Sequence, residues 1–144
     1  MLREVQASDL RGLLELYLHL HEVRIPDDND HLRDTWKQIL SNPNHHVIVY
    51  EEDGKIVSSC NCLIVPNLTR NVRPFALVEY VVTHGEYRNR GYAGQCLSYA
   101  KELAIGCNCY KIMLVTGSKD PKTLHFYESC GYSSDDKTAF VQSL

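Results

Sequence analysis

The sequence predicts an α/β fold, in which short apolar strands alternate with amphipathic helices. Two observations support this prediction. Segments with helical and strand periodicity follow one another along most of the 144 residues, separated by Gly, Pro, Asn and Asp. In addition, the segment Lys111-Ile112-Met113-Leu114-Val115 is nearly all apolar, which is typical of a strand covered on both faces.

The N-terminal segments predict a strand, two helices and a hairpin. A strand is expected at 2–6, and Ser8 can cap a first helix. A second helix is expected at 30–40, after a polar break. Strands at 47–51 and 55–65 then surround Asp53-Gly54, a dipeptide typical of a hairpin turn. The apolar residues of the first helix recur at helical spacing: Leu10, Leu13, Leu14, Tyr17, Leu18 and Leu20.

The C-terminal segments continue the alternation. After a loop at 66–74 we expect strands at 76–83 and 110–115, a helix at 91–105 between them, and a helix after Asp120. A last strand is expected near 138–141. Without repeats or linkers, residues 1–144 form one predicted domain. The helix at 91–105 carries one apolar face, which would fix its N-terminus at the end of the preceding strand: Ala93, Cys96, Leu97, Ala100 and Ala104.

Composition excludes several classes of protein. A formal net charge of −3 and a pI near 6.1 argue against a nucleic-acid partner. No apolar run is long enough to span a membrane, and the polar N-terminus lacks a signal region, so a cytoplasmic protein is expected. The pairs Cys60/Cys62 and Cys107/Cys109 are too closely spaced for a typical zinc site, so no metal is expected. Cys60 and Cys62 instead suit the same face of a strand as small apolar residues.

The segment from Arg88 to Gly94 has the features of a phosphate-binding loop. Gly91, Ala93 and Gly94 remove side-chain bulk at the start of a predicted helix, where free backbone N–H groups favour anions. Arg88 and Arg90 add donors suited to phosphate oxygens. Because Gln95-Cys96 follows Gly94, the loop is not of the nucleoside-triphosphate type. The alternative is a turn that carries two solvated arginines.

Two motifs resemble those of the GNAT family of N-acetyltransferases. The run Arg88-Asn89-Arg90-Gly91-Tyr92-Ala93 is similar to the family's Arg/Gln-x-x-Gly-x-Gly/Ala pyrophosphate motif, and 120–132 is similar to its next motif. The second segment also has local helix signals, with Asp120 as N-cap, Pro121 after it and Gly131 as C-cap. Neighbouring helix positions point about 100° apart, so either Phe126 or Tyr127 can pack while the other faces a cleft.

The resemblance spans roughly 77–132 and implies a fold and a cosubstrate. It implies the GNAT fold, a central mixed twisted β-sheet flanked by helices on both faces, with acetyl-CoA between the strands at 76–83 and 110–115. Segments 108–112 and 126–132 also resemble glucosamine-6-phosphate N-acetyltransferases, whereas the match before Leu77 is poor. A homodimer stays an open alternative. The cofactor-binding residues implied are Val81, Val82, Thr83, Arg88, Asn89, Arg90, Gly91, Tyr92, Ala93, Gly94, Asp120, Phe126 and Tyr127.

Glu79 and Tyr127 are the candidate catalytic residues. Glu79 is the only charged side chain in 76–82, and a buried carboxylate is costly unless it is paired or functional. We therefore interpret it as acceptor of the amine proton, with His84, water or a structural ion pair as alternatives. Strand alternation places Tyr80 on the opposite face from Glu79. The resemblance makes Tyr127 the proton donor to the leaving thiolate, and a backbone N–H of Val81 or Val82 the oxyanion donor. Asp120 replaces the family's usual Asn.

The acceptor is expected to be the primary amine of a small molecule or peptide, acetylated by direct attack in a ternary complex. Arg70 and Arg73 could bind an acidic group on it, whereas the acidic stretch 27–30 could attract a cationic amine. The alternative for each is a solvated loop. The alternatives are an acetyl-CoA sensor without turnover, an acyl-CoA hydrolase or O-acyltransferase, and an amino-sugar phosphate acetyltransferase.

Overall fold

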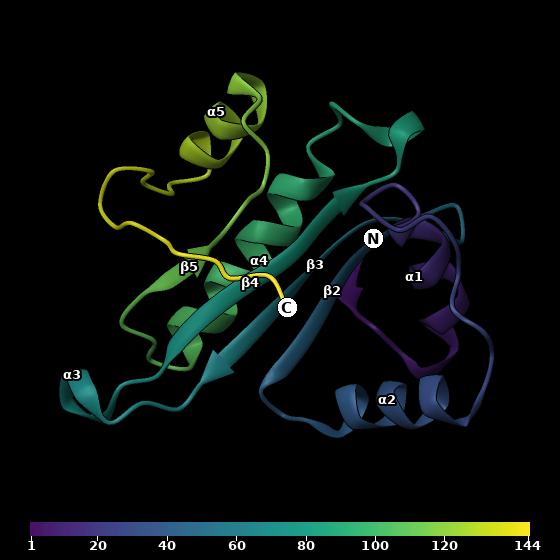
Figure 1. Cartoon of the computed structure of the whole chain (residues 1–144), viewed down its shortest axis with the longest axis horizontal. Helices are drawn as coiled ribbons and strands as arrows, with labels where there is room; N and C mark the ends of the chain where they lie inside the picture. The colour runs from purple at the N-terminus through teal and green to yellow at the C-terminus, as the bar shows by residue number, and fades with distance from the viewer.

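A computed structural model describes all residues, 1–144, and contains one five-stranded mixed sheet (Figure 1). The strands lie in sequence order and the first four are antiparallel, whereas the last is parallel to its neighbour. The mixed sheet predicted from the family resemblance is therefore confirmed. The strands are β1 (Leu2–Glu4), β2 (His45–Glu52), β3 (Lys55–Val65), β4 (Phe75–Thr83) and β5 (Ile112–Leu114).

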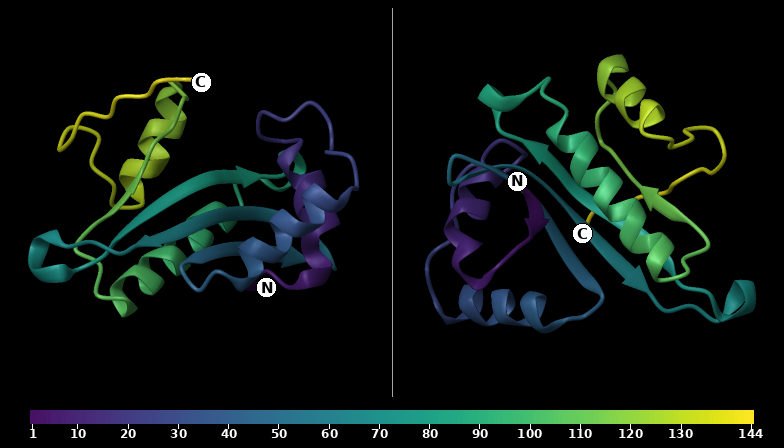
Figure 2. Two further views of the ribbon diagram at one scale, coloured as in Figure 1. Left: turned by 60° about the horizontal axis from the view of Figure 1, so that its bottom comes forward. Right: turned by 180° about the vertical axis from the view of Figure 1, so that it is seen from behind.

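Helices cover both faces of the sheet. Alternation along β2 shows the two sides, because Ile48 belongs to the core under α4 (Tyr92–Gly106) while Val47 and Val49 belong to the other core. The second core lies under α1 (Leu10–Tyr17) and α2 (Asp30–Ser41), where Trp36 is buried. Figure 2 shows α4 crossing the sheet in the view from behind. No helix is long and apolar enough to cross a membrane.

The predicted helices and hairpin form with small shifts at their ends. Asp53 and Gly54 have φ angles of 51° and 78°, which fit the tight turn expected from this dipeptide. The first helix ends at Tyr17, earlier than expected, and buries Leu13 and Leu16, whereas Leu18 is exposed. In α4, Cys96, Leu97, Ala100 and Ala104 are buried as predicted, with Cys60 and Cys62 in the same core.

The prediction of a C-terminal strand is wrong. Residues 130–144, which follow α5 (Pro121–Ser129), contain no strand near 138–141, and the side chains of Phe140 and Val141 are 92% and 78% exposed. Figure 2 shows this stretch running away from the sheet. A β-prone pattern forms a strand only where it finds a neighbour to pair with, and this segment has none on its own chain. The loop 66–74 also contains a short turn, α3 (Thr69–Val72), with left-handed residues inside it.

Candidate active site

A β-bulge interrupts β4 near the centre of the molecule. Ser59 of β3 pairs with Val82, and Asn61 pairs with Glu79, so Tyr80 and Val81 together oppose a single residue of β3. Tyr80 has a φ of 56°, in the left-handed region that costs energy for a residue with a Cβ. A bulge bends its strand and redirects the side chains that follow it. The two halves of β4, before and after the bulge, therefore run in different directions.

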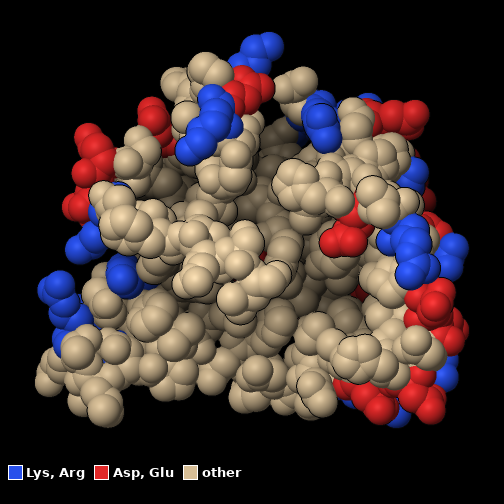
Figure 3. Space-filling view, in the orientation of Figure 1, with Lys and Arg blue, Asp and Glu red and all other residues tan.

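A cleft opens where β4 and β5 separate. Their parallel pairing covers only Ala76–Ile112, Leu77–Met113 and Val78–Leu114, so β5 is shorter than predicted and leaves the rest of β4 without a partner on that edge. A cavity of about 640 Å³ lies beside the unpaired part. Figure 3 shows the surface hollowed between α5 and the loop that follows β4. The family's separation of these two strands, which the sequence could only imply, is therefore present.

Most of the predicted cofactor-binding residues line this cleft. Val81, Val82 and Thr83 contribute from the end of β4, Arg88 to Gly94 from the loop, and Phe126 and Tyr127 from α5. Five further residues line it that were not predicted: His19, Leu20, Tyr87, Lys122 and Thr123. Lys122 and Thr123 lie in the first turn of the second motif, so their position was readable, whereas nothing local to His19 and Leu20 indicates the cleft.

The loop before α4 is shaped for close approach by a ligand. Asn89 and Gly91 have φ angles of 62° and 81°, and Gly91 is the N-cap of α4. A Cβ added at Gly91 or Gly94 would meet no atom within 4 Å, so both positions face open space. The first-turn N–H groups of a helix have no partners within it, and the helix dipole favours an anion there. The geometry therefore suits the pyrophosphate role inferred from the sequence.

The larger side chains of the loop tie it to neighbouring elements. Tyr92 donates a hydrogen bond to Glu52 Oε2 at 2.8 Å and stacks on Tyr50 with ring centroids 4.0 Å apart. Arg90 Nη1 lies 3.5 Å from the same carboxylate oxygen, with its guanidinium over the Tyr87 ring. Glu52 thus fixes the start of α4, and Tyr92 can serve a ligand only through its backbone. No sequence signal links Glu52 to a loop so far along the chain.

On the opposite wall, Phe126 and Tyr127 share one environment. Their ring centroids are 5.3 Å apart, and both side chains pack on the core under α4 while both line the cleft. The expectation that one packs while the other faces the cleft is therefore wrong, because the partly buried end of α5 gives both rings two contacts. Burial, followed by Cys130 and Cys60, raises the pKa of Tyr127, so its hydroxyl stays protonated at neutral pH.

Asp120 and Glu79 do not line the cleft. Asp120 caps α5, where its Oδ1 accepts a hydrogen bond from the N–H of Lys122 at 3.0 Å. Glu79 lies directly across from Asn61, on the face that also carries Val47 and therefore looks toward α1 and α2. Asn61 is 7% exposed, and its buried Oδ1 has no hydrogen-bond partner. An unpaired buried acceptor therefore lies beside Glu79 on that face of the sheet.

Tyr80 does not follow the alternation expected from the sequence. Its ring centroid lies 6.4 Å from that of Tyr17 on α1, on the same side of the sheet as Glu79. The bulge is the cause, since an extra residue in one strand resets which face the following side chains occupy. Tyr17 and Tyr80 therefore lie on the same side of β4 as Glu79, which is the side covered by α1 and α2.

The residues suggested for acceptor binding have other contacts. Arg73 donates to the backbone oxygens of Asn108 and Cys109, and the Arg70 guanidinium lies 5.3 Å from the Tyr110 ring centroid. Both arginines precede β4, at the end of the strand remote from the phosphate loop. In the acidic stretch 27–30, Arg33 pairs with Asp28 and Asp30. Within one chain, neither group contributes to the cleft.

Comparisons with known proteins agree with this geometry. The sequence matches the model of the Acetyltransferase (GNAT) family over residues 10–132. A glucosamine 6-phosphate N-acetyltransferase of Trypanosoma brucei brucei is 28% identical over 136 residues, covering 94% of this chain and 90% of the relative. No group of three or more His, Cys, Asp or Glu side chains is placed to hold a metal ion.

Solved structures give the same result. A protein of Agrobacterium tumefaciens str. C58, assigned as an acetyltransferase, superposes with a TM-score of 0.91 at 40% identity, covering 99% of each chain. The glucosamine-6-phosphate N-acetyltransferase of Arabidopsis thaliana superposes with a TM-score of 0.86 at 25% identity, covering 100% of this chain and 97% of the other. The chain belongs to the GNAT family and is an acyl-CoA-dependent N-acetyltransferase.

Proposed function

We propose that the protein transfers the acetyl group of acetyl-CoA to the primary amine of a small molecule in a ternary complex. The observation that carries this proposal is the cleft between the separated ends of β4 and β5, with the N-terminus of α4 on one wall and Tyr127 on the other. Both walls offer groups that acetyl transfer requires, which are anion-binding amides and a proton donor. Acetyl-CoA would supply the acetyl group as a thioester.

Residues of the chain would supply the other functions that the reaction needs. The amides of 92–94 and the guanidinium of Arg88 would hold the pyrophosphate, and a backbone N–H of Val81 or Val82 would donate to the carbonyl oxygen of the acetyl group. Glu79 would accept the proton of the attacking amine, directly or through water. Since Glu79 lies outside the cleft lining, the route through water fits the geometry better. Tyr127, whose raised pKa keeps its hydroxyl protonated, would give its proton to the departing thiolate.

A screen of primary amines tests this proposal against its alternatives. The protein is incubated with acetyl-CoA and each amine, thiol release is followed, and the product is examined by mass spectrometry. We expect thiol release that depends on the amine, together with an acetylated product. Thiol release without any amine would indicate a hydrolase, and binding of acetyl-CoA without thiol release across the panel would favour a sensor.

An amino-sugar phosphate is the second candidate acceptor. The support is the name of the relatives from T. brucei brucei and A. thaliana, which cover nearly the whole chain. Glucosamine 6-phosphate is therefore compared with glucosamine in the same assay. A marked preference for the phosphorylated sugar would support this acceptor, and equal rates would argue for a simpler amine.

A further inference from the structure

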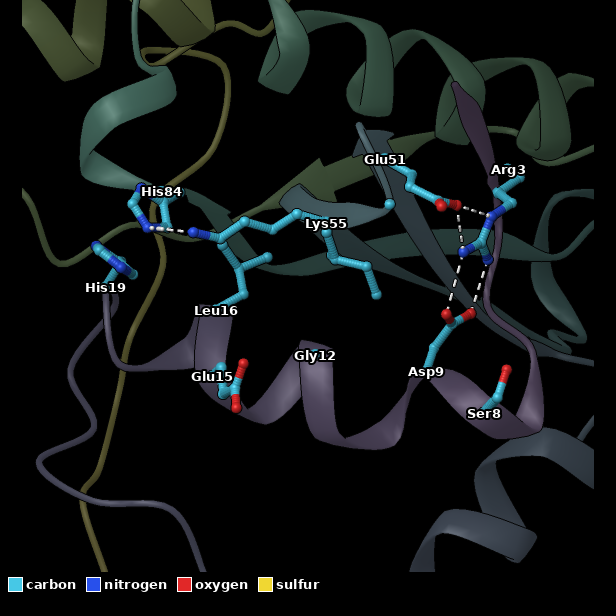
Figure 4. A pocket seen from close by; sticks show the side chains of 12 residues that line it. Arg3, Ser8, Asp9, Gly12, Glu15, Leu16, His19, Glu51, Lys55 and His84 are labelled. Carbon is cyan, nitrogen blue, oxygen red and sulfur yellow. Dashed lines mark hydrogen bonds and ion pairs between the residues drawn. The ribbon is translucent and has the colours of Figure 1, made fainter.

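A second cavity, of about 410 Å³, lies between α1 and the turn of the β2–β3 hairpin (Figure 4). His19 borders both this cavity and the cleft described above. At one end of the cavity, Arg3 is paired with Asp9 and Glu51. At the other end, the side chains of His19, Lys55 and His84 come together from three elements of the fold. This second group has no carboxylate among its direct contacts.

Backbone contacts fix the tautomers of the two imidazoles. His19 Nδ1 accepts a hydrogen bond from the N–H of Gly85 at 3.2 Å, and His84 Nδ1 accepts one from the N–H of Glu86 at 3.1 Å. A neutral imidazole whose Nδ1 accepts must carry its hydrogen on Nε2. Both Nε2 atoms are therefore donors, and neither offers a lone pair to a metal ion.

Lys55 brings a third donor to the same point. Its Nζ lies 3.3 Å from Nε2 of His84, so a donor faces a donor, and the two imidazole centroids are only 4.0 Å apart. Lys55 takes part in none of the ion pairs of the structure. Such an arrangement lacks only an acceptor between its members.

The charges around this group are mostly positive. Burial is the main cause that lowers the pKa of His84, and the neighbouring His19 and Lys55 lower it further. Glu86 raises this pKa, and Arg88 lowers it by the smallest amount. Glu15 also lines the cavity, but its carboxylate is paired with Arg11 at 2.9 Å. An anion would therefore meet uncompensated positive charge at this end of the cavity.

We propose that Lys55 Nζ, His19 Nε2 and His84 Nε2 bind a phosphate group. A phosphate oxygen placed between these atoms converts the donor–donor contact into hydrogen bonds from all three. A phosphate suits the group better than a carboxylate, because it offers more oxygens and more negative charge to donors that converge from the turn after α1, the start of β3 and the residue after β4. Glu79 does not line this cavity, so the site is separate from the proposed proton acceptor.

Two sources can supply such a phosphate. Because His19 borders both cavities, the 3′-phosphate of coenzyme A can reach the site around the turn at 85–87, and this version rests on the proposed function. A separate phosphorylated ligand is the other source and does not depend on acetyl transfer. Both sources use the same donors, so one set of variants tests the site and a competition experiment separates them.

The site is tested first with inorganic phosphate on the full chain without cofactor. We expect saturable changes in the NMR signals of the Gly85 and Glu86 amides and of the two imidazoles. Lys55→Gln removes the charge and should weaken phosphate binding roughly tenfold. His19→Asn keeps a side-chain acceptor near the N–H of Gly85 and removes the Nε2 donor, so it should also weaken binding. Lys101→Gln, an exposed change on α4, is the matched control and should bind as the parent does.

Competition then identifies the source. If saturating coenzyme A abolishes the phosphate response while 3′-dephospho-coenzyme A leaves it, the site holds the cosubstrate's own 3′-phosphate. If phosphate still binds in the presence of either, the site serves a separate ligand. The proposal is overturned if the parent shows no saturable response, or if Lys55→Gln responds as Lys101→Gln does. A failed amine screen would leave the phosphate titration unaffected, so the two proposals fail independently.

Discussion

At the scale of single residues, Tyr127 combines packing with an exposed chemical group. Its ring packs on the core under α4, and its pKa is raised by burial. We predict that Tyr127→Phe keeps the ring contacts and the melting temperature but lowers kcat by roughly tenfold to several-hundredfold, a loss typical of a missing general acid. Steady-state rates, taken where chemistry limits turnover, and calorimetry of coenzyme A binding measure the two effects. Parental turnover in this variant would leave Tyr127 as a packing residue only.

Glu79 has a different setting, because it lies across from Asn61 and outside the cleft lining. Glu79→Gln preserves shape and removes the basic oxygen, so we predict a fall in kcat of about a hundredfold with unchanged cofactor affinity. The pH–rate profile of the variant should also lose the ionisation that belongs to the general base. Should rate and profile match those of the parent, the proton would go to His84 or to water.

At the scale of elements, the start of α4 tests the phosphate cradle. Gly94 has no positive φ, so Gly94→Val adds bulk in open space beside the cleft without backbone strain. We predict at least roughly tenfold weaker acetyl-CoA binding, since losing one hydrogen bond to a charged group has an effect of this size. Gln95→Val, an exposed change at the next position, is the control and should bind normally.

Calorimetry of both variants measures this difference. Gly91→Val should weaken binding as well, but its φ of 81° adds strain of about 1–2 kcal/mol, so it is the less specific change. Unchanged affinity in Gly94→Val would mean that the phosphates do not approach this turn.

The N-terminal elements are joined by ion pairs of Arg3. Its guanidinium contacts Asp9 at 2.7 Å and Glu51 at 2.7 Å, and thus links β1, the turn η1 (Ala7–Asp9) and β2. The hydrogen bond from Arg3 is the main cause that lowers the pKa of Asp9 below its ordinary value of 3.8. This contribution to stability is therefore fully present above the unfolded pKa and is lost as pH falls through the lower folded pKa.

We predict that Asp9→Asn lowers the free energy of unfolding by roughly 1 kcal/mol at pH 7, a value reduced by solvent screening. The difference from the parent should shrink as pH falls below that of the unfolded carboxyl. Urea unfolding at both pH values measures it, with Asp27→Asn as an exposed control. A deficit that is the same at both pH values would show that charge is not the cause.

At the scale of the whole molecule, the cleft is assembled from parts that are far apart in the sequence. A ligand there would touch β4, the start of α4 and α5 together. We predict that acetyl-CoA at about a hundred times its dissociation constant stabilises the fold by about 2.7 kcal/mol, which is a shift in Tm of roughly 5–11 °C. Amide exchange should slow at 85–94 and in α5 while α2 stays unchanged. Protection confined to α2 would place the ligand elsewhere.

The sequence predicted correctly those helices and strands whose ends carry turn or helix-capping residues. β3 runs from Lys55 to Val65 as expected, because Asp53-Gly54 sets the turn. α5 begins at Pro121 because Asp120 is its N-cap and Pro suits the first helical position. Predictions failed where the structure depends on which strand a segment pairs with. The segment 138–141 has strand propensity without a neighbour, and Tyr80 changes face because β3 and β4 differ by one residue at the bulge.

The sequence by itself determined the family, the α/β order and the motif at 88–94, because these depend on residues close together in the chain. Only the tertiary structure decided how β4 and β5 separate, that Glu52 fixes the start of α4, and that His19, Lys55 and His84 meet at one point. Those features join segments far apart in the sequence. Their geometry follows from sheet register and from packing on two cores, which no local pattern of residues encodes.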